Sequence, residues 1–341
     1  MINVFASTVI TGFQDQACLL LQSQLPWFKV LSKSDWFLLY KSTSQISDII
    51  GLPYLNNSFL CLYSSNKKWW NINYFANEVL HQYHKWITLI GFLSRKNLKF
   101  RVMSYFENEP TKIEWRVTKI IEQKIIQKYR NLSIDSMNPD IEFWISMRKW
   151  EEWRFMLRLT KKNSRKWMEK WEMRTEFCYL MSSLAHIQRD DIVMDPFAWH
   201  WSISRTINEY FSCKKIIIND INNEDINYCK SKIIKHWSEI VFSNTNALRF
   251  DTNELWVINH IVTDPPWGIF EVLKPSPEVF YEIFLGCFFK ILSHWGNLVF
   301  CSSQKELSKK MLLKVWFTLK SEINTLLSGK KVSIFVAQKN A

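Results

Sequence analysis

The sequence predicts an α/β protein whose second half forms a mostly parallel, doubly wound sheet and whose first half forms an α+β region. Apolar runs of strand length alternate with segments of helix length from about residue 173 onward. A strand, a long helix, a loop and another strand follow one another between Lys99 and Arg148. The chain has 341 residues, of which 47% are hydrophobic, so we expect two domains rather than one.

The first region, residues 1–150, opens with short apolar runs separated by polar breaks. This pattern indicates strands and one helix within the first 65 residues. Residues 99–106 alternate as a strand does, and Ile113–Tyr129 has the length of a long helix. Residues 136–149 then supply a loop that leads into another strand. This order of elements suits a compact RNA-binding module.

Residues 151–172 are predicted to form a basic linker. Half of the chain's net charge of +12 lies in residues 147–174, which contain ten basic and four acidic residues. Such a strip favours a polyanionic partner, because each neutralised phosphate releases counterions, although a solvated linker would have the same composition. The candidate RNA-binding residues are Arg158, Lys161, Lys162, Arg165 and Lys166.

The second region, residues 173–341, opens with an amphipathic helix, in which Phe177, Leu180, Met181 and Leu184 share one face. Strand candidates separated by helices imply a parallel sheet that binds ligands at the carboxyl ends of its strands. These candidates are Ile192–Met194, Lys215–Ile218, Ile240–Phe242, Val257–Val262, Leu298–Cys301 and Val332–Ala337.

The sharpest motif is Asp264-Pro265-Pro266-Trp267, which directly follows the apolar run at residues 257–262. Two prolines fix the turn, and the first holds Asp264 extended. A carboxylate and a carbonyl can accept two N–H bonds from an exocyclic amine while the indole stacks on the base. A Pro-Pro turn with a capping Asp is the structural alternative.

This motif resembles the (Asp/Asn)-Pro-Pro-aromatic signature of class I methyltransferases that act on amino nitrogens, which implies a Rossmann-like fold and S-adenosylmethionine as cofactor. The family's cofactor loop reads Asp-Pro-Phe-x-Gly-x-Gly-(Ser/Thr), and here Asp195, Pro196, Phe197 and Ser202 match it, while Ala198 stands at the first variable position. The resemblance implies that this loop holds the methionine part of the cofactor. No metal is required.

Tryptophan stands at both glycine positions of that loop, at Trp199 and Trp201. The chain has 18 tryptophans but 7 glycines, and none of the glycines lies between Gly91 and Gly268. Some bacteria read the codon UGA as glycine whereas other genetic codes read it as tryptophan. We therefore hypothesise that these tryptophans, and Trp295 before the fifth strand, are glycines translated with the wrong code. The alternative is a catalytically inactive RNA-binding protein with a filled loop.

The resemblance places further cofactor contacts after the second and third strands. Asp220 ends the second strand and would bind the ribose hydroxyls, a task for which a carboxylate is suited, although a capping Asp is an alternative. Asn246 and Ala247 follow the third strand, where the family contacts the adenine.

The first half resembles a ferredoxin-like segment followed by a THUMP domain, at residues 5–13 and 100–142. Together the resemblances imply an RNA guanine-N2 methyltransferase that acts in tRNA processing or on 23S rRNA. A DNA amino-methyltransferase shares the Asp-Pro-Pro-Trp chemistry and is an alternative. We expect a cytoplasmic protein, because the sequence contains no secretory signal and no apolar run long enough to span a membrane.

Overall fold

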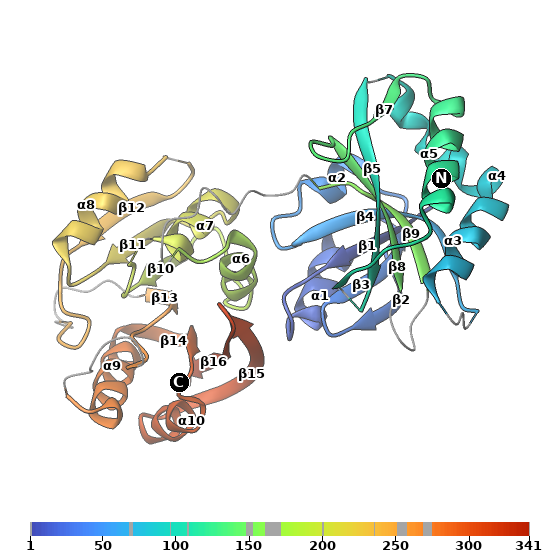
Figure 1. Cartoon of the computed structure of the whole chain (residues 1–341). Coiled ribbons are helices and arrows are strands. Elements are labelled where there is room, and N and C mark those ends of the chain that lie inside the picture. The colour runs from blue at the N-terminus through green and yellow to red at the C-terminus, as the bar shows by residue number, and fades with distance from the viewer. Residues whose placement is uncertain are drawn as a thin grey trace. The chain divides into compact units, whose positions relative to one another are not determined.

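The computed structural model describes residues 2–67, 71–95, 97–107, 109–147, 153–160, 172–199, 201–234, 236–250, 258–268 and 275–340. The chain divides into two compact units, each with its own sheet (Figure 1). Unit 1 comprises residues 1–9 and 18–164, and unit 2 comprises residues 10–17 and 165–341.

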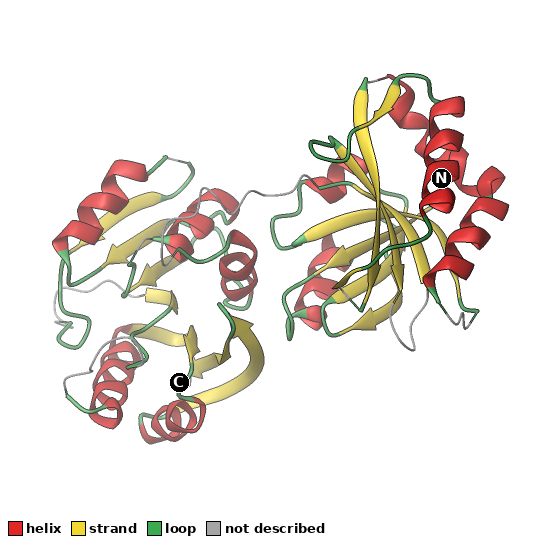
Figure 2. Cartoon of the chain, in the orientation of Figure 1, coloured by secondary structure: helices red, strands yellow, loops and turns green. Residues whose placement is uncertain are grey.

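The first 160 residues form one nine-stranded sheet with helices (Figure 2). The elements are β1 (Asn3–Thr8), α1 (Gln14–Gln24), β2 (Lys29–Ser34), β3 (Phe37–Ser42), α2 (Ile46–Ile50), β4 (Asn57–Ser65), α3 (Ile72–His81), α4 (Tyr83–Trp86), η1 (Ile87–Arg95), β5 (Leu98–Phe106), β6 (Glu109–Pro110), α5 (Trp115–Lys128), β7 (Leu132–Ile134), β8 (Ile141–Met147) and β9 (Trp153–Arg158). The sheet order is β2-β3-β1-β4-β9-β8-β5-β6, with β7 beside β5. The predicted ferredoxin-like and THUMP-like parts therefore share one continuous sheet.

Strand β9 corrects the predicted linker, which was assigned to residues 151–172. It lies between β4 and β8 at the centre of the sheet, and five of its six residues are buried. Arg154 and Arg158 interrupt an otherwise apolar run, and their charges made the segment resemble a solvated strip. Residues 161–171 of the predicted linker lie outside the described residues.

Unit 2 is a seven-stranded sheet with helices packed against it (Figure 1). Its elements are α6 (Thr175–Ser183), β10 (Ile192–Asp195), α7 (Ser202–Tyr210), β11 (Lys215–Asn219), α8 (Asn223–Lys232), β12 (Glu239–Ser243), β13 (Ile258–Thr263), α9 (Pro277–Ile291), β14 (Leu292–Ser302), α10 (Lys305–Lys314), β15 (Phe317–Leu327) and β16 (Lys330–Lys339). The order β12-β11-β10-β13-β14 is parallel throughout, and β16 and β15 follow antiparallel. The predicted, mostly parallel sheet is thus confirmed.

The core of unit 2 lies between this sheet and helices α9 and α10. Phe284 and Phe288 of α9 are fully buried, and Phe284 meets Phe300 of β14, which stacks on Phe335 of β16. Burying large rings of this kind contributes roughly 1.5–3 kcal/mol for each side chain. This core packs the strands against the two helices and fixes where the strands end.

The strand order reverses beside β10. The chain runs from β10 outward to β11 and β12, and then returns across the sheet to β13 on the other side of β10. In open α/β sheets, ligands bind in the crevice at such a reversal, outside the carboxyl ends of the strands. The site is therefore expected between the loops that follow β10 and β13.

Candidate active site

Asp195 is the last residue of β10, and its carboxylate is buried. Oδ1 accepts a hydrogen bond from the Thr263 hydroxyl at 2.9 Å, and Oδ2 accepts one from the Ser204 hydroxyl at 3.0 Å. These bonds join β10 to the end of β13 and to α7. Burial raises the pKa of Asp195 to about 7, although both hydroxyl donors act to lower it. The structure therefore gives this residue, which the sequence assigned to cofactor binding, a bracing position beneath the loop.

The loop after β10 is anchored at both ends. The Phe197 ring lies against three aromatic rings of α9, those of Phe280, Phe284 and Phe288. Ala198 is buried, and its N–H donates to the Asn219 carbonyl at 2.9 Å. The backbone N–H of Trp201 then donates to the Ala198 carbonyl and closes a tight turn.

Trp199 and Trp201 adopt left-handed backbone conformations, with φ of 45° and 53°. Residues with side chains rarely occupy this region, and a bulky residue there is an outlier that costs of order 1–3 kcal/mol. The loop thus has the backbone geometry of the glycine loop that the resemblance implies, while its two side chains are the largest available.

The Trp199 side chain spans the gap between the loops after β10 and β13. Its Nε1 donates to the main-chain carbonyl of Asp264 at 3.2 Å, and its backbone N–H donates to Asp220 Oδ2 at 3.0 Å. The side chain is partly exposed. One residue therefore links three of the sequence-predicted site segments.

Asp220 lies just past β11 and is buried. Oδ2 accepts the Trp199 N–H, and Oδ1 accepts the Asn222 N–H at 2.9 Å. Each carboxylate oxygen retains a second lone pair. The acid is therefore held firmly and can still accept hydroxyl donors from a ligand.

Asn219 was missed at the sequence level, although it precedes Asp220. Its Nδ2 donates to the carbonyls of Pro196 and Thr245, both at 3.0 Å, and its Oδ1 accepts from the Thr245 N–H and hydroxyl. This amide joins the end of β11 to the loops that follow β10 and β12. A buried polar residue at the end of an apolar strand was the available signal, and only the acid beside it was selected.

Asn246 and Ala247, predicted near the adenine, follow β12. Asn246 Oδ1 accepts from the Leu248 N–H at 3.0 Å, which shapes a turn, and Ala247 is buried in the core of unit 2. Asn244, which was not selected, donates from Nδ2 to the Asp220 carbonyl at 2.8 Å. This loop is therefore tied directly to the segment that carries Asp220.

The Asp264–Trp267 segment forms the other wall of the gap. Trp267 Nε1 donates to Asp264 Oδ1 at 3.0 Å, and Gln304 Nε2 donates to the Trp267 carbonyl at 3.3 Å. Pro265 is buried, whereas Pro266 is half-buried. Burial raises the pKa of Asp264 to about 8, and the nearby carboxylate of Asp195 acts in the same direction. The carboxyl group is thus held by one donor in a position where it titrates near neutral pH.

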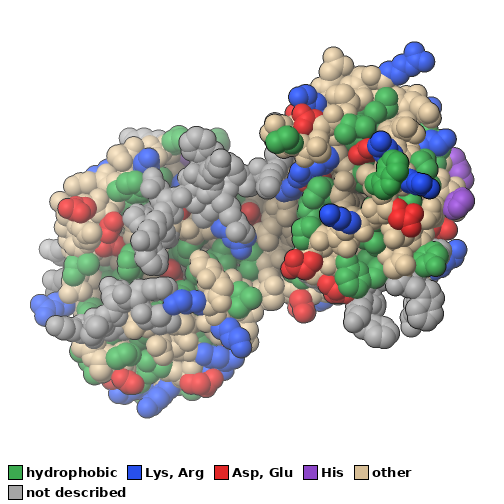
Figure 3. All heavy atoms as spheres, in the orientation of Figure 1, with side chains coloured by type: hydrophobic (Ala, Val, Ile, Leu, Met, Phe, Trp, Pro, Cys, Tyr) green, Lys and Arg blue, Asp and Glu red, His purple; other side chains and the backbone are tan. Residues whose placement is uncertain are grey.

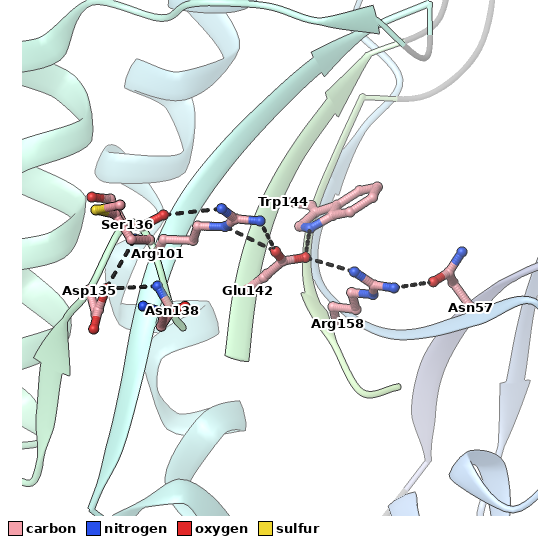
Figure 4. Close-up of polar contacts among 9 residues, drawn as sticks. Asn57, Arg101, Asp135, Ser136, Asn138, Glu142, Trp144 and Arg158 are labelled. Atoms are coloured by element: carbon pink, nitrogen blue, oxygen red, sulfur yellow. Dashed lines mark hydrogen bonds and ion pairs between the residues drawn. The ribbon is translucent and has the colours of Figure 1, made fainter. Parts of the chain in front are cut away.

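Arg158, assigned to RNA binding from the sequence, lies instead in a polar network of unit 1 (Figure 4). Its guanidinium donates to Glu142 Oε2 at 2.9 Å and to Asn57 Oδ1 at 2.6 Å, while Arg101 also contacts Glu142. Burial alone would raise the pKa of Glu142, but hydrogen bonds from Arg158, Arg101 and Trp144 hold it below its usual value. Arg158 is therefore engaged in an internal ion pair rather than standing as a free surface cation.

The other predicted RNA-binding residues, Lys161, Lys162, Arg165 and Lys166, lie outside the described residues. On the face shown in Figure 3, Lys and Arg side chains of the described residues are interspersed with Asp and Glu side chains. Within the described residues, no group of three or more His, Cys, Asp or Glu side chains is arranged to hold a metal ion. No described helix is both long and apolar enough to cross a membrane.

The fold and the loop geometry place unit 2 among the Rossmann-like methyltransferase folds. No protein-family model and no curated protein matches the sequence. The fold of TrmN from Thermus thermophilus matches this chain with a TM-score of 0.79 at 17% identity, over 99% of this chain and 100% of that one.

Two further solved structures match along nearly the whole chain. SMU.472, a candidate methyltransferase in complex with SAH, has a TM-score of 0.64 at 10% identity and covers 98% of this chain and 97% of its own. A protein from Listeria monocytogenes, described as an N6-adenine-specific DNA methylase by prediction, has a TM-score of 0.64 at 12% identity, over 98% and 96%. These likenesses establish the fold of both units, a unit with the methyltransferase fold that follows an N-terminal unit in the sequence.

Proposed function

We propose that this chain transfers a methyl group from S-adenosylmethionine to an exocyclic amine of RNA, N2 of guanosine in tRNA or 23S rRNA. One observation carries the proposal: the loop after β10 and the Asp-Pro-Pro-Trp segment after β13 meet at the reversal of strand order. There the Trp199 Nε1–H occupies the Asp264 carbonyl as an amine N–H of a substrate would. The likeness to TrmN and to a structure that contains SAH supports the same activity.

The described residues suit two parts of the proposed cofactor, its ribose and its adenine. Asp220 offers a fixed carboxylate for the ribose hydroxyls, and the Asn246 turn lies beside it through the Asn244 bond. The third part, the methionine loop, has the backbone of a glycine loop but carries two indoles at Trp199 and Trp201. The position of Asp220 therefore supports a ribose site, whereas the two indoles occupy the loop proposed for the methionine part.

The acceptor side relies on Asp264. When bound, the cofactor supplies a methyl group on a positively charged sulfur. An amine lone pair conjugated into a base is a poor nucleophile, so both N–H bonds must be held to direct it. The Asp264 carboxylate and a main-chain carbonyl, that of Asp264 or of Pro265, would accept them, and Trp267 would stack on the base. The amine proton can leave through Asp264 or water after transfer.

Methyl transfer from labelled S-adenosylmethionine tests this function. The protein is incubated with tRNA, ribosomal RNA, and single-stranded and duplex DNA, and the modified nucleosides are identified by mass spectrometry. We expect N2-methylguanosine in RNA. Label in DNA alone would instead support the DNA amino-methyltransferase, which the likeness to the Listeria protein favours. If neither the printed chain nor a W199G/W201G chain transfers label, the fold serves as a binding protein.

Substitutions in the basic residues of the predicted linker test whether the protein binds RNA there. Replacing Lys161, Lys162, Arg165 and Lys166 with Ala should lower the slope of log affinity against log salt by roughly three to four units, at about 0.7–0.9 for each phosphate contact. As a control, replacing four exposed lysines of unit 2 with Ala should leave the slope of log affinity against log salt nearly unchanged. These control substitutions are K230A, K232A, K310A and K320A.

An unchanged slope in the strip variant would remove the strip from the RNA-binding surface. The next candidate would then be a groove of unit 1 with a volume of about 390 Å³. Lys112 and Lys119 line it beside the exposed ring of Trp115. Cations beside an exposed aromatic ring are suited to hold single-stranded nucleic acid.

A further inference from the structure

Among the described residues other than glycine, left-handed backbone conformations fall mainly on tryptophan. Among the described residues, eight other than glycine have a positive φ, and five of these eight are tryptophan. Only a few per cent of non-glycine residues adopt this conformation, and Asn, Asp and His are the types enriched there. The five are Trp27 (54°), Trp199 (45°), Trp201 (53°), Trp295 (66°) and Trp316 (70°). A backbone that demands glycine therefore recurs at tryptophan in both units.

The side chains of these tryptophans do little to compensate for the strained backbone. Tryptophan is normally among the most buried residues, because its ring removes a large apolar area from water. Four of the five are instead exposed, by 82% at Trp27, 79% at Trp316, 60% at Trp295 and 41% at Trp199. Only Trp201 is buried, at 3%.

Other tryptophans of the same chain behave as tryptophan should. Trp86 is fully buried, its Nε1 donates to the Val79 carbonyl at 2.8 Å, and its ring meets the Phe155 ring edge-on. Trp144 stacks on Tyr105 and donates to Glu142. The described tryptophans thus include some that pack, such as Trp86 and Trp144, and five that occupy glycine geometry.

The composition of the chain agrees with this division. The 18 tryptophans and 7 glycines together make 25 of 341 residues. This is about 7% of the chain, which is the usual share of glycine alone. The deficit of glycine is therefore similar in size to the excess of tryptophan.

We propose that residues 27, 199, 201, 295 and 316 are glycine in the protein made by its own cell, where UGA codons at these positions are read as glycine. The backbone argument at positions 27, 295 and 316 is independent of any activity. The consequence at positions 199 and 201 rests on the proposed function. There, glycine would remove the indole that occupies the Asp264 carbonyl and would open the loop to the methionine part of the cofactor.

The codons and the native protein give the most direct test. The gene should have UGA at all five positions and UGG at Trp86 and Trp144, and peptides of the protein isolated from its source cell should have the mass of glycine at the five. UGG at the five positions, or peptides with tryptophan there, would overturn the inference.

A second test uses stability and needs no knowledge of the reaction. Thermal melting compares three proteins: the chain with tryptophan at all five positions, a triple variant with W27G, W295G and W316G, and a W86G control. At each of the three exposed positions, glycine relieves the strain of a side chain on a left-handed backbone, and little packing is lost. We therefore expect the melting temperature to rise by roughly 2–4 °C for each substitution. The W86G control should melt lower, because it leaves a cavity. A triple variant that melts at or below the printed chain contradicts the proposal.

A third measurement separates this inference from the proposed function. Binding of S-adenosylmethionine is measured by calorimetry for the printed chain and for W199G/W201G, and the glycine loop should bind at least tenfold more tightly. If the triple variant gains stability while neither loop form binds the cofactor, the glycine assignment at the three exposed positions stands and the proposed function fails. Equal, tight binding by both loop forms would show that the indoles do not obstruct the loop, and would refute the assignment there.

Discussion

The loops after β10 and β13 both begin with Asp-Pro at the end of a parallel strand, yet the two acids have different surroundings. Asp195 accepts a hydroxyl on each oxygen, from Thr263 and Ser204, and is buried. Asp264 has the Trp267 indole on one oxygen and retains some exposed surface. The comparison teaches that an Asp-Pro step recurs at the ends of these parallel strands, while the neighbouring donors decide whether both oxygens of the acid are engaged or one is left accessible.

The largest expected effect is on the acid that faces the gap. Asp264→Ala should lower the rate of methyl transfer by about 100-fold or more, because a positioned acceptor of the amine N–H bonds is lost. The dissociation constant for S-adenosylmethionine should change little. Rates and binding are measured with whichever form of the 199–201 loop is active. Asp190→Ala, which removes an exposed acid before β10, serves as the control, and wild-type turnover in Asp264→Ala would refute the assignment.

Substitution of Asp195 should affect stability rather than the rate of methyl transfer. Asp195→Ala leaves the buried hydroxyls of Thr263 and Ser204 without their acceptor, and we expect a loss of about 3 kcal/mol in the free energy of unfolding. Asp195→Asn retains one acceptor oxygen and should recover part of that loss. Urea unfolding measures both variants. An Asp195→Ala protein as stable as the parent would mean that the two loops do not differ as the structure indicates.

Some strands of the fold could be predicted from the sequence and others could not. The parallel strands β10 to β14 were predictable, because each contains a short apolar run. Strand β15 was missed, because Ser321 and Thr325 interrupt its apolar alternation and only two of its eleven residues are buried. Strand β9 was missed because Arg154 and Arg158 interrupt it, and the partner that neutralises Arg158, Glu142, lies in another strand.

The site shows the same division. The motifs at Asp195, Asp220 and Asp264 place three acids at one edge of the sheet, as the spacing predicted. The spacing of the motifs could not predict the hydrogen bonds that distinguish one acid from another. The hydroxyl of Thr263 that engages Asp195 comes from a residue 68 positions away, and the Asn219 amide joins the end of β11 to two loops. Such bonds depend on tertiary packing that no local pattern records.

A moderate effect is expected at the third acid. Asp220→Ala removes the carboxylate proposed for the ribose and should raise the cofactor dissociation constant about tenfold or more, in line with a charge-assisted hydrogen bond. Calorimetry with S-adenosylmethionine and SAH measures this directly. Asp225→Ala, on the neighbouring helix α8, is the matched control. An unchanged constant would exclude Asp220 from the cofactor site and leave Asp264 as the only acid of the three that acts on a ligand.

The smallest effect concerns the pH dependence of stability and sharpens the comparison between the two carboxyl groups. The pKa of Asp264 is raised from 3.8 to about 8, chiefly by burial. Between these values the unfolded chain ionises while the folded chain keeps its proton, so stability falls as pH rises from about 4 to about 8 and is level above that. The pKa of Asp195 is also raised, to about 7, and contributes in the same direction.

Asp264→Asn isolates one of these contributions, because its amide oxygen can still accept the Trp267 indole N–H but cannot ionise. Asp195 titrates in both proteins, so its contribution largely cancels in the difference between their melting temperatures. We expect Asp264→Asn to match the parent near pH 4 and to melt progressively higher than the parent as pH approaches 8. Thermal melts from pH 4 to pH 9 measure the gap. A constant gap across this range would mean that Asp264 ionises in the folded protein as it does in the unfolded chain, and that its half-buried position does not raise its pKa.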